Sequence, residues 1–261
     1  MQTHFKNEEF IVKKSGMRNI EVCCTSVEDA LQAAEGGAVR IELCSALGGG
    51  GVTPSAGLIL SVVKSVAGVL DVNVLIRPND GAFNYSPSEI RVILEDIGFC
   101  RRAGVSGVVV GALTPDGDID IEACRAMVNA ASGMKLTFHR AFDVCPDPSG
   151  ALEQIAGLGF DHILTSGQRA KAIDGAALIG ELVEQASGRL VVMPGSGVNP
   201  SNIAEIERLT GASEFHSTAR KPVPEICRRH VPELGFDEPS AGPGLVLRTS
   251  ADVVRELIDA Q

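Results

Sequence analysis

The chain has 261 residues, of which 44% are hydrophobic and 21% are charged, so it holds enough apolar sequence for a large core and is unlike disordered chains. Its formal net charge is -10, with one tyrosine and no tryptophan, which argues against nucleic-acid binding: phosphates repel an acidic surface, and base stacking needs aromatic side chains. No run of about 18 apolar residues occurs, so no membrane-spanning segment is predicted.

The ends of the chain and its cysteines bear on domain organisation and location. Residues 1–16 carry several charges and no apolar run typical of a signal peptide, so we expect a short N-terminal extension before one domain at 17–261. The seven cysteines are odd in number and include no CxxC pair, which predicts reduced thiols in the cytoplasm and argues against a structural zinc site.

Short β-branched runs alternate with amphipathic helical runs along the chain. The expected strands are residues 19–26, 40–45, 71–77, 107–112, 135–140, 162–166, 189–193 and 214–218. The expected helices are 27–35, one with Pro54 in its first turn, 87–103, 121–131, 149–158, 176–186, 200–209 and 250–259. The proline-rich stretch 221–244, before the last helix, is expected to be irregular.

Eight strands joined by helical crossovers predict a parallel sheet. A length near the ~250 residues typical of (β/α)8 barrels favours a single-domain (β/α)8 TIM barrel over an open doubly wound sheet. The glycine-rich loop Gly48–Gly51 has neither the Rossmann nor the Walker A spacing, so it does not predict a nucleotide site.

Two neighbouring strands carry the same Glu-apolar-Cys pattern, Glu21–Cys23 and Glu42–Cys44. Residues two apart share a strand face and neighbouring strands lie ~5 Å apart, so Cys23 and Cys44 could reach one ion if both point inward. Thiolates suit Cu(I). The alternative is that both cysteines are small buried apolar residues, since free cysteine is among the most buried residue types.

Functional residues of such a barrel lie where strands end and βα loops begin. The candidates for catalysis there are charged or titratable: Arg77, His139, Arg140, Asp143, His216, Glu21 and Glu42. The arginines and histidines predict a pocket for an anionic or polyhydroxylated small molecule, with a histidine as acid or base. For Glu21 and Glu42, together with Arg40, the alternative is an internal salt-bridge network.

The loop after the seventh strand is a candidate phosphate site. Gly195, Ser196 and Gly197 precede a helix expected from Pro200, and Ser217 lies near the end of the eighth expected strand. Backbone N–H groups after strands seven and eight often bind phosphate in such barrels. The alternative is a tight turn that needs glycine.

Taken together, several of these segments resemble the CutC copper-homeostasis family. The resemblance runs from Asn19 to Arg220 and rests on 21–23, 40–45, 50–55, 76–78, 139–143, 164–167 and 214–217. It implies a TIM barrel, a cytoplasmic location and a homo-oligomer, a dimer or a tetramer. It also implies a copper role in which Cys23 and Cys44 bind Cu(I). Gly-Ser-Gly stands where the family usually has three glycines, and the match is poor after Arg220.

Two functional hypotheses follow. The first is a copper homeostasis protein that binds Cu(I) through cysteine thiolates. The second is a TIM-barrel enzyme, an isomerase, lyase or hydrolase, that acts on a small anionic or phosphorylated substrate. No strand ends in the lysine that a Schiff-base aldolase would need, because Lys135 begins a strand and Lys221 follows the last one.

Overall fold

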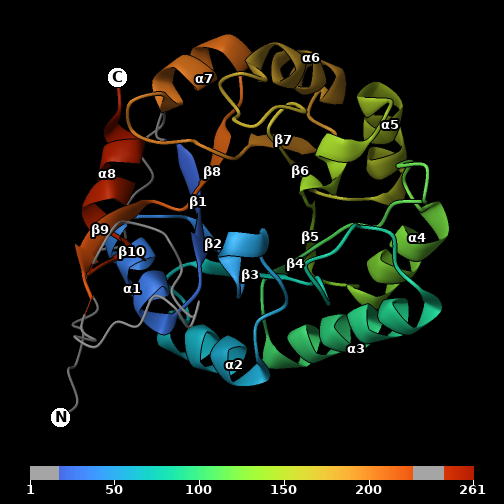
Figure 1. Cartoon of the computed structure of the whole chain (residues 1–261), viewed down its shortest axis with the longest axis horizontal. Coiled ribbons are helices and arrows are strands. Elements are labelled where there is room, and N and C mark those ends of the chain that lie inside the picture. The colour runs from blue at the N-terminus through green and yellow to red at the C-terminus, as the bar shows by residue number, and fades with distance from the viewer. Residues whose placement is uncertain (1–17, 226–243) are drawn as a thin grey trace.

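The computed structural model describes residues 18–225 and 244–261, and in these residues eight parallel strands surround a common axis inside a ring of helices (Figure 1). The strands are β1 Asn19–Cys24, β2 Arg40–Leu43, β3 Asp71–Leu75, β4 Gly107–Val110, β5 Lys135–Phe138, β6 His162–Thr165, β7 Val191–Pro194 and β8 Glu214–Ser217. The predicted TIM barrel is confirmed. The expected extension at 1–16 lies outside the described residues.

The strand order is β7-β6-β5-β4-β3-β2-β1-β8, and β8 also lies beside β7, so the sheet curls round on itself. The register places Cys23 opposite Glu42 on β2, and Glu21 opposite Arg40 on β2 and His216 on β8. Residues that alternate along these strands therefore point together into the barrel.

Seven of the predicted strands end one or two residues too late, and the seventh strand begins two residues later than expected. Several residues just after the strands, such as Ile76, Arg77 and Ala112, are buried like strand residues although they lie outside the strands. The backbone N–H of Arg77, for example, donates to Thr53 Oγ1 at 2.9 Å. Hydrophobic pattern alone therefore extends these strands too far.

Helices cover the outside of the barrel. They are α1 Val27–Gly36, α2 Ala56–Ser65, α3 Pro87–Ala103, α4 Ile121–Ala130, α5 Pro148–Leu158, α6 Ala176–Ala186, α7 Ile203–Thr210 and α8 Ala251–Asp259, with 3-10 turns η1 Leu47–Gly49 and η2 Arg140–Val144. The prediction for α3 matches in both bounds, because Ser86 and Glu89 form a capping box and Gly104 ends the helix in the left-handed region.

Two predicted helix starts differ from the structure by more than one residue. Pro54 does not lie in the first turn of α2, because Ser55 accepts a hydrogen bond from the Leu58 N–H as the N-cap. Helix α7 begins at Ile203 rather than Pro200, because Asn199 and Asn202 close turns with their side chains: the Ser201 N–H donates to Asn199 Oδ1 and the Asn199 N–H to Asn202 Oδ1, each at 2.9 Å.

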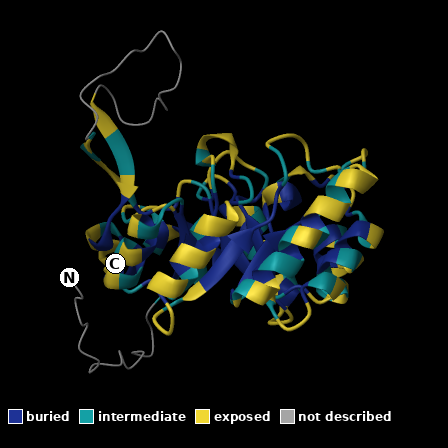
Figure 2. Ribbon diagram, turned by 90° about the horizontal axis from the view of Figure 1, so that it is seen from below, coloured by how far each residue is buried: buried dark blue, intermediate teal, exposed yellow. Residues whose placement is uncertain are grey.

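The segment expected to be irregular is partly regular. Strands β9, Arg220–Pro224, and β10, Leu245–Thr249, form an antiparallel pair outside the barrel, which stands away from the ring in Figure 2. Residues 226–243, with Cys227, lie outside the described residues.

The main core lies between the strands and the helices, and a smaller apolar cluster lies inside the barrel. The smaller cluster consists of Cys23, Cys44, Leu75 and Val109, with Leu47 packed against it. Over residues 18–225 and 244–261, no helix combines the length and the apolarity that crossing a bilayer requires.

Candidate functional site

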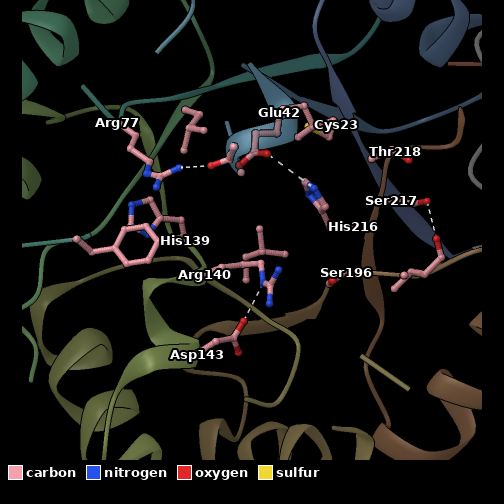
Figure 3. A pocket seen from close by; sticks show the side chains of 18 of the residues that line it. Cys23, Glu42, Arg77, His139, Arg140, Asp143, Ser196, His216, Ser217 and Thr218 are labelled. Atoms are coloured by element: carbon pink, nitrogen blue, oxygen red, sulfur yellow. Dashed lines mark hydrogen bonds and ion pairs between the residues drawn. The ribbon is translucent and has the colours of Figure 1, made fainter. Parts of the chain in front are cut away.

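A pocket of about 500 Å³ opens at the carboxyl ends of the strands (Figure 3). Ten of the predicted site residues line it: Cys23, Glu42, Arg77, His139, Arg140, Asp143, Ser196, Gly197, His216 and Ser217. Glu21, Cys44 and Gly195 do not line it. The barrel thus gathers residues from β1, β2, β8 and the loops after β3, β5 and β7 into one place.

The two predicted metal-binding cysteines lie together inside the barrel. Cys23 Sγ and Cys44 Sγ are 3.5 Å apart, and both side chains are buried. The hydrogen bond with Cys44 raises the pKa of the Cys23 thiol well above its ordinary value, and burial and the charge of Glu42 raise it further. Cys23 lines the pocket, so an ion from the pocket meets Cys23 first.

Below the pocket, Glu21 belongs to a buried network of charges. Its carboxylate pairs with Arg40 and bonds to His216 Nδ1 at 2.8 Å. Burial would raise the pKa of Glu21, but the His216 hydrogen bond and the Arg40 charge lower it to about 2. Arg40 also pairs with Glu214 at 2.8 Å, and Glu214 lies 3.3 Å from His162. The salt-bridge interpretation therefore describes Glu21 and Arg40.

Glu42 differs from Glu21 because it faces the pocket. Its Oε2 lies 3.7 Å from His216 Nε2, and ligand atoms of Cys23, Glu42 and His216 all lie within 4.8 Å of one another. Burial raises the pKa of Glu42. Burial would lower the pKa of His216, but the hydrogen bond with Glu21 and the charge of Glu42 raise it. A soft sulfur, a carboxylate and an imidazole thus converge on one point.

Arg77 is largely committed to holding loops. It donates to the carbonyl oxygens of Gly49, Gly51 and Gly81 at 2.8–3.0 Å, and its guanidinium lies 5.0 Å from the Phe83 ring centre. Its Nε has no partner in the described part of the chain. Arg77 therefore shapes the wall of the pocket and adds positive charge to it.

His139 is buried and neutral. Its Nδ1 accepts the Ala141 N–H at 3.3 Å, while Nε2 has no partner among residues 18–225 and 244–261. Burial and the positive charge of Arg77 lower the pKa of His139 to about 3. Near neutral pH, His139 can therefore offer an Nε2–H donor but has no second proton to give. This favours His216 over His139 as the proton carrier.

Arg140 and Asp143 form a second polar group. Arg140 donates to Asp143 at 2.8 Å and to Ser166 Oγ at 2.9 Å. The Asp143 carboxylate also accepts the backbone N–H groups of Ser166 and Gln168 at 3.0–3.1 Å. The hydroxyl groups of Thr165 and Ser166 also donate to this carboxylate, so Asp143 holds the loop after β6.

The loop after β7 lines the pocket with Ser196, Gly197 and Val198. Ser196 and Gly197 adopt left-handed φ values of 75° and 72°. The N–H groups of Ser196, Gly197 and Val198 donate to no group in the described residues. Ser217 Oγ, in contrast, donates to Val198 O at 2.7 Å and so braces this loop. Gly195 packs under it, since a Cβ there would lie 2.5 Å from Leu164 Cδ1.

Sequence reasoning missed Phe83 and Leu164, which line the pocket. The Phe83 ring lies 4.9 Å from the His139 ring and covers Arg77, so it excludes water from both. An aromatic residue in a loop after a strand end was the available signal for Phe83. Leu164 lies in the 164–167 segment of the family resemblance, but as an apolar residue of a strand it was not singled out as a site residue.

Comparison with known proteins identifies the family. The model of the CutC family matches residues 18–221. The chain belongs to the CutC family. A CutC family protein of Parabacteroides distasonis is 49% identical over 206 residues, covering 79% of this chain and 84% of the relative. A human protein named copper homeostasis protein cutC homolog is 48% identical over 210 residues, covering 79% and 76%.

Solved structures agree with this membership. The copper homeostasis protein CutC of Streptococcus agalactiae has a TM-score of 0.75 and 35% identity, covering 77% of this chain and 99% of that one. The deoxyribose phosphate aldolase of Aeropyrum pernix, at 15% identity and a TM-score of 0.60, shares only the fold. The CutC resemblance predicted from sequence motifs is confirmed.

Proposed function

We propose that this CutC family member binds Cu(I) through the thiolates of Cys23 and Cys44 and serves in copper homeostasis. The observation that carries the proposal is the 3.5 Å separation of the two sulfur atoms in a buried site beside the pocket. Cu(I) selects soft sulfur ligands. A metal–sulfur bond is about 2.3 Å long for zinc, so two sulfurs this close need little movement to share an ion.

Copper binding must displace protons from these thiols. Because the pKa of Cys23 is raised, its thiol is protonated near neutral pH, and a proton leaves when a metal ion binds. Affinity should therefore rise as the pH rises, by up to about tenfold per pH unit for each proton displaced.

The test is an anaerobic titration of the reduced protein with Cu(I) against a competing chelator. The variants are Cys23→Ser and Cys44→Ser, with Cys124→Ser as the control. Cys124 is also buried, but its Sγ donates to Ala112 O, a bond that serine can keep. We expect tight one-site binding that each of the first two substitutions weakens and the control leaves intact. Equal binding by all variants would rule out the cysteine pair.

A cytoplasmic location and a homo-oligomeric state, dimer or tetramer, remain proposals drawn from the family resemblance. The odd set of cysteines without a CxxC pair supports the reducing compartment. Light scattering checks the assembly, since the monomer has a mass of 27.3 kDa. A solution mass equal to the monomer would contradict it.

The size and polarity of the pocket favour a second candidate, an isomerase, lyase or hydrolase acting on a small anionic or phosphorylated molecule. A volume of about 500 Å³ exceeds what a lone ion needs. The free N–H groups of Ser196–Val198 and the Arg140 guanidinium suit an anion, and His216 with Glu42 suits proton transfer.

Inorganic phosphate provides the test of this second candidate. Bound phosphate should raise the melting temperature of the wild type, and the rise should shrink in Arg140→Gln. Exposed Arg125→Gln, remote from the pocket lining, is the control. No rise at millimolar phosphate, or the same rise in Arg140→Gln, would argue against an anion site there.

A further inference from the structure

We propose that Cys23, Glu42 and His216 form a three-ligand site for a divalent cation, best suited to Zn²⁺, which shares Cys23 with the two-thiolate copper site and differs from it in its other ligands. The three residues lie on the adjacent strands β1, β2 and β8 and point into the barrel. Their ligand atoms lie within 4.8 Å of one another, and Glu42 Oε2 and His216 Nε2 are 3.7 Å apart. Tetrahedral zinc with bonds of ~2.0–2.3 Å spaces its ligands by roughly 3.3–3.8 Å, so small side-chain movements complete the site.

The second observation is the support behind the imidazole. His216 Nδ1 bonds to Glu21 Oε1 at 2.8 Å, which directs Nε2 toward Glu42 and the pocket. A carboxylate bonded to the far nitrogen is the arrangement that orients metal-binding histidines and raises their basicity. Glu21 is itself held by Arg40, so the imidazole has a rigid support.

The third observation is the charge of Glu42. It is 6% exposed, and no arginine or lysine of the described residues lies within 4 Å of its carboxylate. Its ion-pair partner among these residues is the His216 imidazole, which is itself one of the three proposed ligands. The Glu42 carboxylate is therefore buried with no arginine or lysine beside it, and a divalent ion bound by Glu42 and Cys23 would supply the missing positive charge.

The donor set selects the ion. A thiolate, an imidazole and a carboxylate are the three ligand types that zinc accepts, whereas Mg²⁺ and Ca²⁺ prefer oxygen alone and Cu(I) prefers sulfur. Cys23, Glu42 and His216 all line the pocket, whereas Cys44 does not. Three protein ligands with an open fourth position are typical of catalytic zinc, where a water or a substrate oxygen binds. The pocket therefore fits small molecules with an oxygen donor.

This inference does not rest on copper binding. The two sites share Cys23 and would exclude each other, but they differ in their remaining ligands. Cys44→Ser removes a copper ligand and leaves the three zinc ligands in place. Glu42→Gln and His216→Asn each remove a zinc ligand and leave both copper ligands in place. Failure of one site is therefore distinguishable from failure of the other.

The experiment uses the full chain, reduced and freed of metal under anaerobic conditions. Co²⁺ is the spectroscopic probe, and Zn²⁺ affinity follows from competition with a chromophoric chelator. We expect one equivalent of Co²⁺ to give a thiolate-to-metal absorption band that Zn²⁺ removes. Loss of an outer-shell partner typically costs 10–100-fold in metal affinity, so we expect Glu42→Gln and His216→Asn to cost about 100-fold or more. Cys44→Ser should bind Zn²⁺ much as the wild type does.

Three results would overturn the proposal: no stoichiometric Zn²⁺ or Co²⁺ binding, wild-type affinity in Glu42→Gln, or a loss in Cys44→Ser as large as in Cys23→Ser. The last result would assign the divalent ion to the cysteine pair. Circular dichroism checks that each variant is folded. If His216→Asn unfolds because Glu21 loses its partner, Glu42→Gln decides alone, since glutamine keeps the size of the side chain.

Discussion

At the scale of single residues, the two Glu-apolar-Cys segments have different parts in the molecule. Glu21 lies beneath the pocket and joins Arg40 to His216, whereas Glu42 faces the pocket beside Cys23. Glu21 and Glu42 thus lie at successive levels along the barrel axis: Glu21 stabilises the charge network, and Glu42 is a candidate metal ligand. The difference comes from their neighbours: Glu21 pairs with Arg40, whereas the ion-pair partner of Glu42 among the described residues is the His216 imidazole.

The Glu21→Gln substitution should change how stability depends on pH. The pKa of Glu21 is about 2 in the folded protein against an ordinary 4.5, so its ionisation contributes stability that is present above pH 4.5 and is lost as the pH falls toward 2. The shift corresponds to at most about 3 kcal/mol. We expect Glu21→Gln to have a lower free energy of unfolding than the wild type at pH 7. The difference between the two proteins should be smaller at pH 3.

Urea unfolding at both pH values measures this gap. Exposed Glu184→Gln is the matched control and should follow the wild type at both pH values. A gap for Glu21→Gln that stays the same from pH 7 to pH 3 would show that the carboxylate charge is not what stabilises the network.

At the scale of elements, the loops after the strands decide which side chains reach the pocket. Asp143, in η2, accepts hydrogen bonds from backbone groups just after β6 and so links two βα loops. The sequence motif around His139–Asp143 predicted a functional cluster, and the structure divides it into a neutral donor, His139, and a loop-holding pair, Arg140 and Asp143.

Asp143→Ala should loosen the loop after β6 and leave the barrel folded. The substitution leaves the N–H groups of Ser166 and Gln168 without their acceptor, at a cost of about 1–3 kcal/mol for each group that stays buried. Hydrogen–deuterium exchange of these two amides should accelerate, while amides of β1–β3 stay protected. Unchanged exchange at Ser166 and Gln168 would mean that Asp143 does not hold this loop.

At the scale of the whole molecule, the ring closes where the last helix meets the first. Helix α8 packs against α1, and the two approach so closely at Gly36 that a Cβ there would lie 2.5 Å from Val254 Cβ and 2.9 Å from Ala251 O. The Thr249 N–H also donates to Asp29 Oδ1 at 3.2 Å, which ties β10 to α1. These contacts join residues more than 200 positions apart and complete the barrel.

Gly36→Ala tests how much the contact between α1 and α8 contributes to stability. A methyl group there forces α8 away from α1, and overpacking of this kind typically costs about 1–3 kcal/mol. Gly157→Ala is the control, because a Cβ at Gly157 in α5 meets nothing within 4 Å and alanine favours the helix by roughly 0.5–1 kcal/mol. Urea midpoints should move in opposite directions for the two variants. A midpoint for Gly36→Ala at or above that of the wild type would contradict the tight contact.

The amino-acid sequence by itself determined the order of elements and the barrel class, because period-2 and period-3.6 patterns and local caps such as Ser86 are properties of neighbouring residues. It also determined the CutC membership, since the motifs lie in order along the chain. Only the tertiary structure decided that Cys23 Sγ and Cys44 Sγ lie 3.5 Å apart, that Glu42 and His216 join Cys23 at one point, and that Arg77 and Asp143 hold loops. Those facts depend on strand register, barrel shear and loop contacts between distant residues, for which local sequence patterns carry no signal.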